Sequence, residues 1–539
     1  MDTQAQGTRT MVDNGIERSV TTAAPGLPAR MTAAAAEMID RISLPIYGLV
    51  IACFATLFAL ATRLLSMEAD EAWILLSTDY VFGVPAPVTN VLGSPTVTTG
   101  GPHLLVHGVL GWITSDLLAH RAVTLVAAAG LLLLVYRALR RADTPVGRAV
   151  AGTALFAAVP GFVLQAGMAM GEVFAAAFLV WAAIHWVRRG AGSMPAAIIA
   201  GVLLGLACAA RVSCAAAIPA LVIYVLFTRF SDRRMLSRAV AAALIAAIIM
   251  GLMVAIYFHL GSMAAAGTPH PYLATASATG LSKPKSLGRM LQSIEIGAWF
   301  LARDKAQVGS QPGARSAQSY DLAGVLLFMG LAQLAAWVVV APIPHLRYLW
   351  PAMACIWLSG IILLLDLWHR ARTPVARLAL HGIVVTGCGY ALIVGALTLV
   401  HGESLTLVYQ AMGVSPRLPI SGERRFRAAA DQRALAAFVA SRPASARFFA
   451  ITPPVAYPIA YLGGRNVEPA IAMAGGGERY MLILPADYTV WRPGPGFDAW
   501  RRTHARPAFQ SGGVAAFRIA EDAPAPPIRQ YPVGENDLF

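Results

Sequence analysis

Three carboxylates follow directly after the first long apolar run of the sequence. The stretch SMEADEAWILL contains Glu68, Asp70 and Glu71, and the apolar residues 72–76 come next, so the chain holds these acids where it returns to a membrane surface. Acids in the first turn of a helix are stabilised by the helix dipole, which is the structural interpretation of Asp70. The chemical interpretation is that a carboxylate fixed at this depth accepts a proton from a hydroxyl nucleophile. This stretch alone favours the structural interpretation.

Further polar residues recur at the ends of later apolar runs. Glu172 follows QAGMAMG, Arg211 lies between two runs in CAARVSCAA, and His345 and Arg347 lie in APIPHLRYLWPA. Charged groups near bilayer depth are costly and often functional, although a single Arg also serves as an anchor at the interface. Because all of these groups are expected on one side of the membrane, together with Asp70, they favour a polar site over separate anchors.

The composition is that of a polytopic membrane protein. Of the 539 residues, 57% are hydrophobic and only 13% are charged, and the mean hydropathy is +0.61. This balance lies outside the range of soluble globular domains. The net charge of +14 comes from Arg residues in short clusters between apolar runs, which is typical of cytoplasmic loops. We therefore expect a membrane as partner and no nucleic acid.

The sequence predicts an α-helical fold with about eleven transmembrane helices. A spanning helix needs about 20 apolar residues. The runs that meet this requirement are 44–65, 121–137, 147–166, 171–187, 194–210, 212–228, 238–260, 322–341, 346–366 and 378–400. A weaker eleventh span at 286–304 places the later Arg clusters on the same side as the earlier ones, as the positive-inside rule requires. The alternative for 286–304 is an amphipathic helix on the membrane surface.

The Arg clusters also predict the orientation. They comprise Arg137, Arg140 and Arg141, then Arg188 and Arg189, then Arg229, Arg233, Arg234 and Arg238, and finally His369, Arg370, Arg372 and Arg377. If these clusters face the cytoplasm, the N-terminus is cytoplasmic and SMEADEAWILL lies outside. We expect residues 1–40 to form a flexible cytoplasmic tail and the protein to be a multi-pass protein of the inner (plasma) membrane.

Two segments of the first external loop are predicted to lie along the membrane surface. They are the helix at 70–81 and the short apolar stretch PHLLVHGVLGWITSDLL, which is expected to be helical over 103–118. Counting the second as a crossing would place Arg137 outside, so an interfacial position fits better. A loop of this kind suits a substrate that itself lies in the membrane.

The last part of the chain changes in character. The transmembrane core is expected at 41–402, a small external α/β domain at 403–522 and a Pro-rich tail at 523–539. Residues 425–441 are predicted to be helical. Short strands are predicted at RFFAITP, RYMLILPA and GVAAFRIA, which are separated by Pro and Gly turns.

The order of these features resembles the GT-C class of membrane glycosyltransferases, which includes protein O-mannosyltransferases and the aminoarabinose transferases of lipid A. The resemblance covers roughly residues 44–400 and rests on an ordered combination rather than on one motif. Its elements are DEAW after the first span, PHLLVHGVLGW, AHRAVTLVAAAGLLLLVYRALRR, GMAMGEVFAAAFLVWAA, GVLLGLACAARVS and HLRYLWPA.

The resemblance implies inverting transfer of a sugar from a polyprenyl-phosphate donor at the outer face of the membrane. The acceptor is a lipid, a glycan or a protein. Asp70 occupies the position of the general base. Glu71 then orients Asp70 or helps to bind a divalent cation, and Glu172 matches a second acidic position.

The resemblance also implies a substrate-binding set. Arg211 and Arg347 match basic positions that would neutralise the lipid phosphate, and His345 and His103 are further candidates for substrate contact. The loop after His103 has His where relatives often have Pro, and this departure from the family pattern concerns the acceptor side. The scattered histidines lack the spacing of metal ligands, so no cofactor is predicted beyond the optional divalent cation.

Two other functions remain open from the sequence. A transporter or flippase of lipid-linked sugars would place ionisable residues near the middle of facing spans. A non-catalytic partner in envelope-glycan assembly would use the external domain for binding, with Asp70 as a helix-start charge. No P-loop, GxSxG or HExxH motif occurs in the sequence.

Overall fold

The computed structural model describes most of the chain. The described residues are 27–84, 101–141, 144–188, 193–229, 231–264, 314–340, 349–371, 373–401, 423–451, 453–470, 473, 476–483, 491–493 and 496–530. The weak span predicted at 286–304 lies outside them, as do His345 and Arg347. Residues 1–26 of the predicted cytoplasmic tail and residues 531–539 of the predicted Pro-rich tail also lie outside them.

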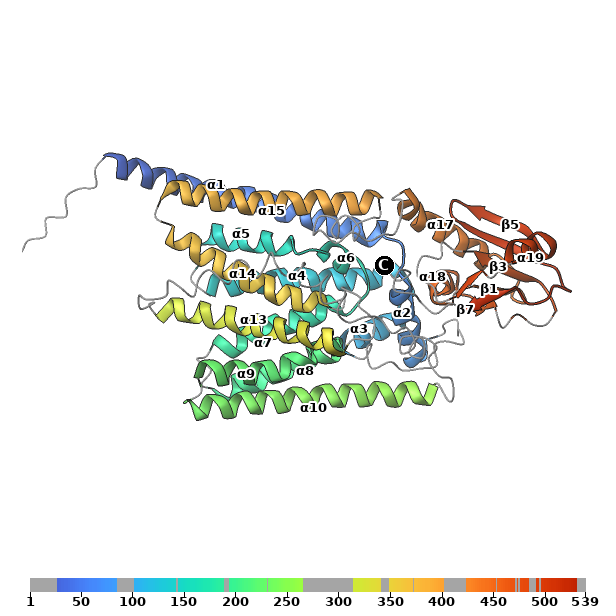
Figure 1. Ribbon diagram of the computed structural model, residues 1–539, viewed down its shortest axis with the longest axis horizontal. Coiled ribbons are helices and arrows are strands. Elements are labelled where there is room, and N and C mark those ends of the chain that lie inside the picture. Colours follow the sequence, from blue (N-terminus) through green and yellow to red (C-terminus); the bar gives the residue numbers. More distant parts are fainter. Residues whose placement is uncertain are drawn as a thin grey trace, which may run out of the picture.

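Long helices run side by side in a bundle with the C-terminal domain at one end (Figure 1). The bundle helices are α1 (Leu27–Leu64), α4 (Leu117–Arg141), α5 (Val146–Ala157), α7 (Glu172–Arg188), α8 (Met194–Ala210), α9 (Ala217–Arg229), α10 (Arg233–Ala264), α13 (Ala314–Val340), α14 (Trp350–Arg370) and α15 (Pro374–His401). Within the described part of the chain, seven helices are long and apolar enough to cross a membrane. The predicted helical membrane fold is thus confirmed.

Two expectations about the helices are corrected. The span predicted at 147–166 is two helices, α5 and α6 (Phe162–Gly167), separated at Pro160 and Gly161. Gly161 lies directly before α6 and has a left-handed φ of 77°, a conformation that glycine tolerates, so the chain turns between the two helices. The tail predicted at residues 1–40 is helical from Leu27 onward, because MTAAAAEMIDR consists largely of good helix formers.

Small residues allow the bundle helices to approach closely. A Cβ added to Gly201 would lie 2.6 Å from the carbonyl oxygen of Ala242, and one added to Gly205 would lie 2.7 Å from Ile249. These glycines on α8 therefore let α10 pack against the helix backbone, as in small-xxx-small contacts of membrane helices.

Two short helices cover the end of the bundle next to the C-terminal domain, which we call the domain-side end. They are α2 (Ala69–Val81) and α3 (Pro102–Gly111), at the positions predicted for interfacial helices. The second ends earlier than the predicted 103–118. The chain turns there because Asp116 accepts a hydrogen bond from the backbone of Leu118, 3.1 Å away, and so begins α4.

The C-terminal domain is a small mixed sheet with three helices. The strands follow the order β2 (Val467–Pro469), β1 (Arg447–Ala450), β3 (Arg479–Ile483), β6 (Val514–Ile519) and β5 (Ala505–Ser511), and β4 (Trp491–Pro493) pairs with β7 (Ile528–Gln530). Strand β1 is parallel to β2 and β3, whereas β6 is antiparallel to β3 and β5. The helices are α17 (Glu423–Ala440), α18 (Pro453–Gly463) and α19 (Phe497–His504). The three predicted strand runs coincide with β1, β3 and β6.

Candidate functional site

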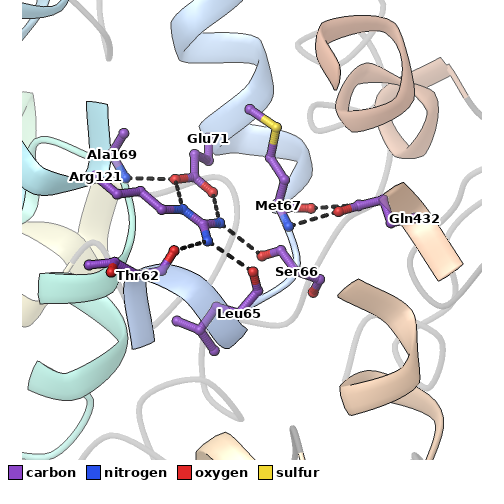
Figure 2. Close-up of polar contacts among 8 residues, drawn as sticks. All are labelled: Thr62, Leu65, Ser66, Met67, Glu71, Arg121, Ala169 and Gln432. Carbon is purple, nitrogen blue, oxygen red and sulfur yellow. Dashed lines mark hydrogen bonds and ion pairs between the residues drawn. The ribbon is translucent and has the colours of Figure 1, made fainter. Parts of the chain in front are cut away.

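A buried ion pair fixes the start of α2. The guanidinium of Arg121 donates two hydrogen bonds to Glu71, from Nε to Oε1 at 2.8 Å and from Nη2 to Oε2 at 2.6 Å (Figure 2). The side chains are 1% and 0% exposed. Two parallel hydrogen bonds between a planar guanidinium and a carboxylate strengthen the ion pair and also fix the relative orientation of the two groups. Glu71 of α2 and Arg121 of α4 are therefore held in one geometry.

The same guanidinium closes the end of α1. Arg121 donates from Nη1 to the carbonyl oxygens of Thr62 and Leu65, each at 2.9 Å, and from Nη2 to that of Ser66 at 3.1 Å (Figure 2). The last carbonyls of a helix have no partner within the helix. Arg121 satisfies them and compensates Glu71 at once, so it joins the end of α1 to the start of α2.

A second buried ion pair, between Glu172 and Arg211, is connected to this cluster by the segment 168–171. The backbone N–H of Ala169 donates to Oε1 of Glu71 at 2.7 Å, which ties the segment 168–171 to α2. That segment leads directly into Glu172, the first residue of α7, and Glu172 forms a short ion pair with Arg211. Glu172 is fully buried and Arg211 is 5% exposed. The segment 168–171 therefore connects the two ion pairs.

His103 lies against this second ion pair. A Cβ added to Gly171 would lie 2.8 Å from Cε1 of His103, so only glycine fits between the ring and the start of α7. His103 is 1% exposed. Its pKa is held well below the usual range, first by burial and then by the neighbouring His107 and Arg211. His103 is therefore a neutral imidazole that can donate or accept a hydrogen bond.

Two further histidines continue from His103 toward the start of α4. His107 and His120 contact each other through their Nδ1 atoms at 3.2 Å, and both are buried. Burial and the neighbouring His120 lower the pKa of His107 to about 3. Among the residues that the structure describes, no three His, Cys, Asp or Glu side chains are arranged to hold a metal ion.

Asp70 differs from Glu71 and Glu172 in exposure. It lies in the first turn of α2, directly before Glu71, and is only partly buried. Backbone N–H groups at a helix start favour negative charge on such a side chain. The structure thus places a partly accessible carboxylate directly beside the fully buried carboxylate of Glu71.

The structure brings most of the sequence-predicted residues into two connected clusters. Glu71 pairs with Arg121, and Glu172, Arg211 and His103 lie together beside the segment 168–171. Asp70 adjoins the first cluster through the chain. His345 and Arg347 lie outside the described residues, so the structure does not place them relative to either cluster.

Sequence reasoning did not single out Arg121. The signal was present in AHRAVTLV, where an Arg opens an apolar span at the end opposite the Arg clusters. The positive-inside rule disfavours a basic residue there, so an Arg in that position indicates a specific partner. Asp79 of α2 was also missed; it is 5% exposed, and burial raises its pKa to about 7.

Two crystal structures share this fold. ArnT from Cupriavidus metallidurans bound to undecaprenyl phosphate matches with a TM-score of 0.55 and 13% identity, covering 89% of this chain and 98% of that chain. The apo form of the same ArnT matches with a TM-score of 0.52 and 14% identity over the same shares. The sequence matches no protein-family model and no curated protein. The predicted resemblance to the GT-C class is confirmed at the level of the fold, and the chain is a multi-pass membrane protein.

Proposed function

We propose that this chain is an inverting glycosyltransferase that moves a sugar from a polyprenyl-phosphate donor to an acceptor at the outer face of the inner membrane. The fold shared with ArnT, one structure of which holds undecaprenyl phosphate, supports a lipid-linked donor. The observation on which the proposal depends is the contrast between Asp70, which is partly exposed, and the buried Glu71 beside it.

In this mechanism Asp70 is the general base. It accepts the proton of the acceptor hydroxyl while that oxygen attacks the anomeric carbon of the sugar. The bond between the anomeric carbon and the phosphate oxygen breaks from the opposite side, and the polyprenyl phosphate leaves with the electron pair. Attack from the opposite side inverts the anomeric configuration. The acceptor is a lipid, a glycan or a protein.

We assign Glu71 to positioning rather than to cation binding. Both of its carboxylate oxygens accept hydrogen bonds from Arg121, and Oε1 also accepts one from the backbone of Ala169. A carboxylate engaged in this way has its charge compensated inside the protein. Glu71 therefore fixes the first turn of α2, and with it the position from which Asp70 acts.

The second cluster is proposed to bind the donor phosphate. In the described part of the chain, neither ring nitrogen of His103 has a hydrogen-bond partner, and one of the two carries a proton that it can donate to an anion. Buried polar groups are ordinarily paired, so these atoms support the binding of a polar ligand here. Because Glu172 balances the charge of Arg211, we propose that Arg347 supplies the counter-charge to the phosphate, with His345 as its neighbour.

The distribution of arginines supports the proposed orientation. Arg141 ends α4, Arg229 ends α9 and Arg370 ends α14, at the end of the bundle away from the C-terminal domain (Figure 1). Basic residues concentrate in cytoplasmic loops. The domain-side end would then face outward, where a lipid-carried sugar is available and nucleotide sugars are not expected.

The experiment that tests this function is a transfer assay in membranes with a panel of radiolabelled polyprenyl-phosphate sugars. We expect the wild type to transfer from one donor and Asp70→Asn to lose transfer by about 100-fold or more, because general-base catalysis contributes about 10²–10⁴-fold. Asp366→Asn is the matched control, since it makes the same chemical change at the opposite end of the bundle and should keep near wild-type activity. Equal transfer by Asp70→Asn would exclude Asp70 as the base, and no transfer from any donor would contradict the proposed function.

A further inference from the structure

A side chain of the C-terminal domain holds the backbone just before α2. Gln432 of α17 accepts a hydrogen bond at Oε1 from the N–H of Met67 and donates one from Nε2 to the carbonyl oxygen of Met67, each at 2.9 Å (Figure 2). An amide that bonds both groups of one residue reproduces the pairing of a neighbouring strand. It therefore sets the position and the direction of the backbone at Met67.

The backbone at Met67 depends on this contact. Residues 66–68 lie between the end of α1 and the start of α2 and belong to no helix or strand. Met67 is 3% exposed. Buried backbone groups need hydrogen-bond partners, and Gln432 supplies both for Met67. Removing the amide would leave the segment that leads into Asp70 with fewer constraints.

The domain also buries one face of α2. Ala72, Leu75 and Leu76 of α2 are fully buried in one apolar cluster with residues of the C-terminal domain. The domain residues in that cluster include Leu435 and Val439 of α17 and Tyr457, Ile459 and Ala460 of α18. Helix α2 thus packs between the bundle and the domain (Figure 1).

A second polar contact joins the domain to the chain just before α4. The hydroxyl of Tyr461 in α18 donates to the carbonyl oxygen of Ser115 at 3.1 Å. Ser115 lies in the turn before α4, the helix that supplies Arg121. The domain therefore contacts the chain just before Glu71 and again shortly before Arg121.

We propose that the C-terminal domain is a working part of the catalytic site, with Gln432 as the positioning residue that holds the Ser66–Asp70 segment in place for Asp70. This inference rests on the proposed function, because it assigns the domain a role in that reaction. If the domain served only to bind a partner protein, its contacts with α2 and with Met67 would not be needed. Small displacements of a catalytic group, of about 1 Å, lower rates by about 100-fold.

The test compares Gln432→Ala with Gln510→Ala in the full-length protein in nanodiscs. Gln510 lies exposed on β5 of the same domain, so its variant controls for loss of a glutamine amide away from α2. We expect faster hydrogen exchange over residues 66–70 and a kcat lower by about 10- to 100-fold, with the donor KM unchanged, in Gln432→Ala alone. Tyr461→Phe removes only one hydroxyl and serves if Gln432→Ala does not fold; it should raise exchange in the turn before α4 that contains Ser115 and lower kcat by a smaller factor.

Two results would overturn the proposal. One is an unchanged kcat in a folded Gln432→Ala protein whose exchange over 66–70 has risen. The other is unchanged exchange together with a changed KM, because the residue would then act on substrate binding by another route. Failure of the proposed function is distinguishable, since the wild type itself would then transfer sugar from no donor.

Discussion

The two ends of the helical bundle use ion pairs in different ways. At the domain-side end, Glu71 and Arg121 are 0% and 1% exposed, and the Glu172–Arg211 pair is similarly buried. At the opposite end, Arg229 and Asp321 are 50% and 35% exposed, and Arg370 and Asp366 are 48% and 20% exposed. These ion pairs are shielded from water at the domain-side end and are accessible to water at the opposite end.

This difference indicates what each end is built for. Exposed pairs contribute about 0–1 kcal/mol, because water screens them and the side chains lose freedom. Buried pairs must offset a large loss of hydration and do so only with well-formed hydrogen bonds. A bundle that needed only anchors could use exposed pairs at both ends. The buried pairs at the domain-side end therefore indicate a requirement for fixed geometry.

The opposite end still uses its polar residues to join helices. The hydroxyl of Tyr320 donates to Asp366 at 2.5 Å, and that of Tyr224 donates to Asp321 at 3.0 Å. These contacts connect α13 to α14 and α9 to α13 within reach of water. They serve the packing of the bundle.

The largest expected effect comes from Glu71→Gln. This change keeps the shape of the side chain but leaves the buried charge of Arg121 without its counter-ion, which should lower the free energy of unfolding by about 3–5 kcal/mol. Denaturation of the detergent-solubilised protein measures the loss. If Glu71→Gln lowered the free energy of unfolding no more than the loss of an exposed acid at the opposite end, burial would not make this ion pair more important for stability.

A smaller, pH-dependent effect is expected from Asp79→Asn. Burial raises the pKa of Asp79 from its ordinary 3.8 to about 7. Between those values the folded state binds more protons than the unfolded state, so this carboxyl makes the protein less stable as pH rises from about 4 to about 7. The variant should therefore gain stability relative to the wild type over that range, by roughly 1–4 kcal/mol at pH 8.

The measurement is the difference in free energy of unfolding between wild type and Asp79→Asn at pH 5, 6, 7 and 8. His107→Gln provides a contrast of opposite sign, because the pKa of His107 is lowered to about 3 and its contribution grows as pH rises toward 6.5. A difference between Asp79→Asn and wild type that stays constant from pH 5 to pH 8 would refute the role assigned to Asp79.

The smallest effect is expected from Asp366→Asn at the opposite end. Its partner Arg370 is 48% exposed, so the pair should contribute less than about 1 kcal/mol. The same denaturation experiment checks this value, and sugar transfer should be retained. A loss as large as that of Glu71→Gln would remove the contrast between the two ends.

The sequence predicted most of the bundle because hydropathy and length alone define a spanning helix. The apolar run 121–137 lies within α4, and the acidic DEAW lies at the start of α2 as expected. The break between α5 and α6 was missed because an unbroken apolar run outweighed Pro160 and Gly161 in the hydropathy pattern.

The partners within the site could not be predicted in the same way. Glu71 and Arg121 are 50 residues apart in sequence, and Met67 and Gln432 are 365 apart. Nothing in local spacing connects such residues, because tertiary packing alone brings them together. The sequence identified Glu71, Glu172 and Arg211 as unusual, but their ion pairs became visible only in three dimensions.

The most direct test of the proposed reaction follows the glycosidic bond of the donor. Purified protein in nanodiscs would receive the active polyprenyl-phosphate sugar labelled with ¹³C at its anomeric carbon, and NMR would record where the label goes and in which configuration. We expect the label to enter the acceptor with inverted configuration in the wild type and to remain in the donor in Asp70→Asn. Retained configuration, or equal transfer by Asp70→Asn, would contradict direct displacement assisted by Asp70.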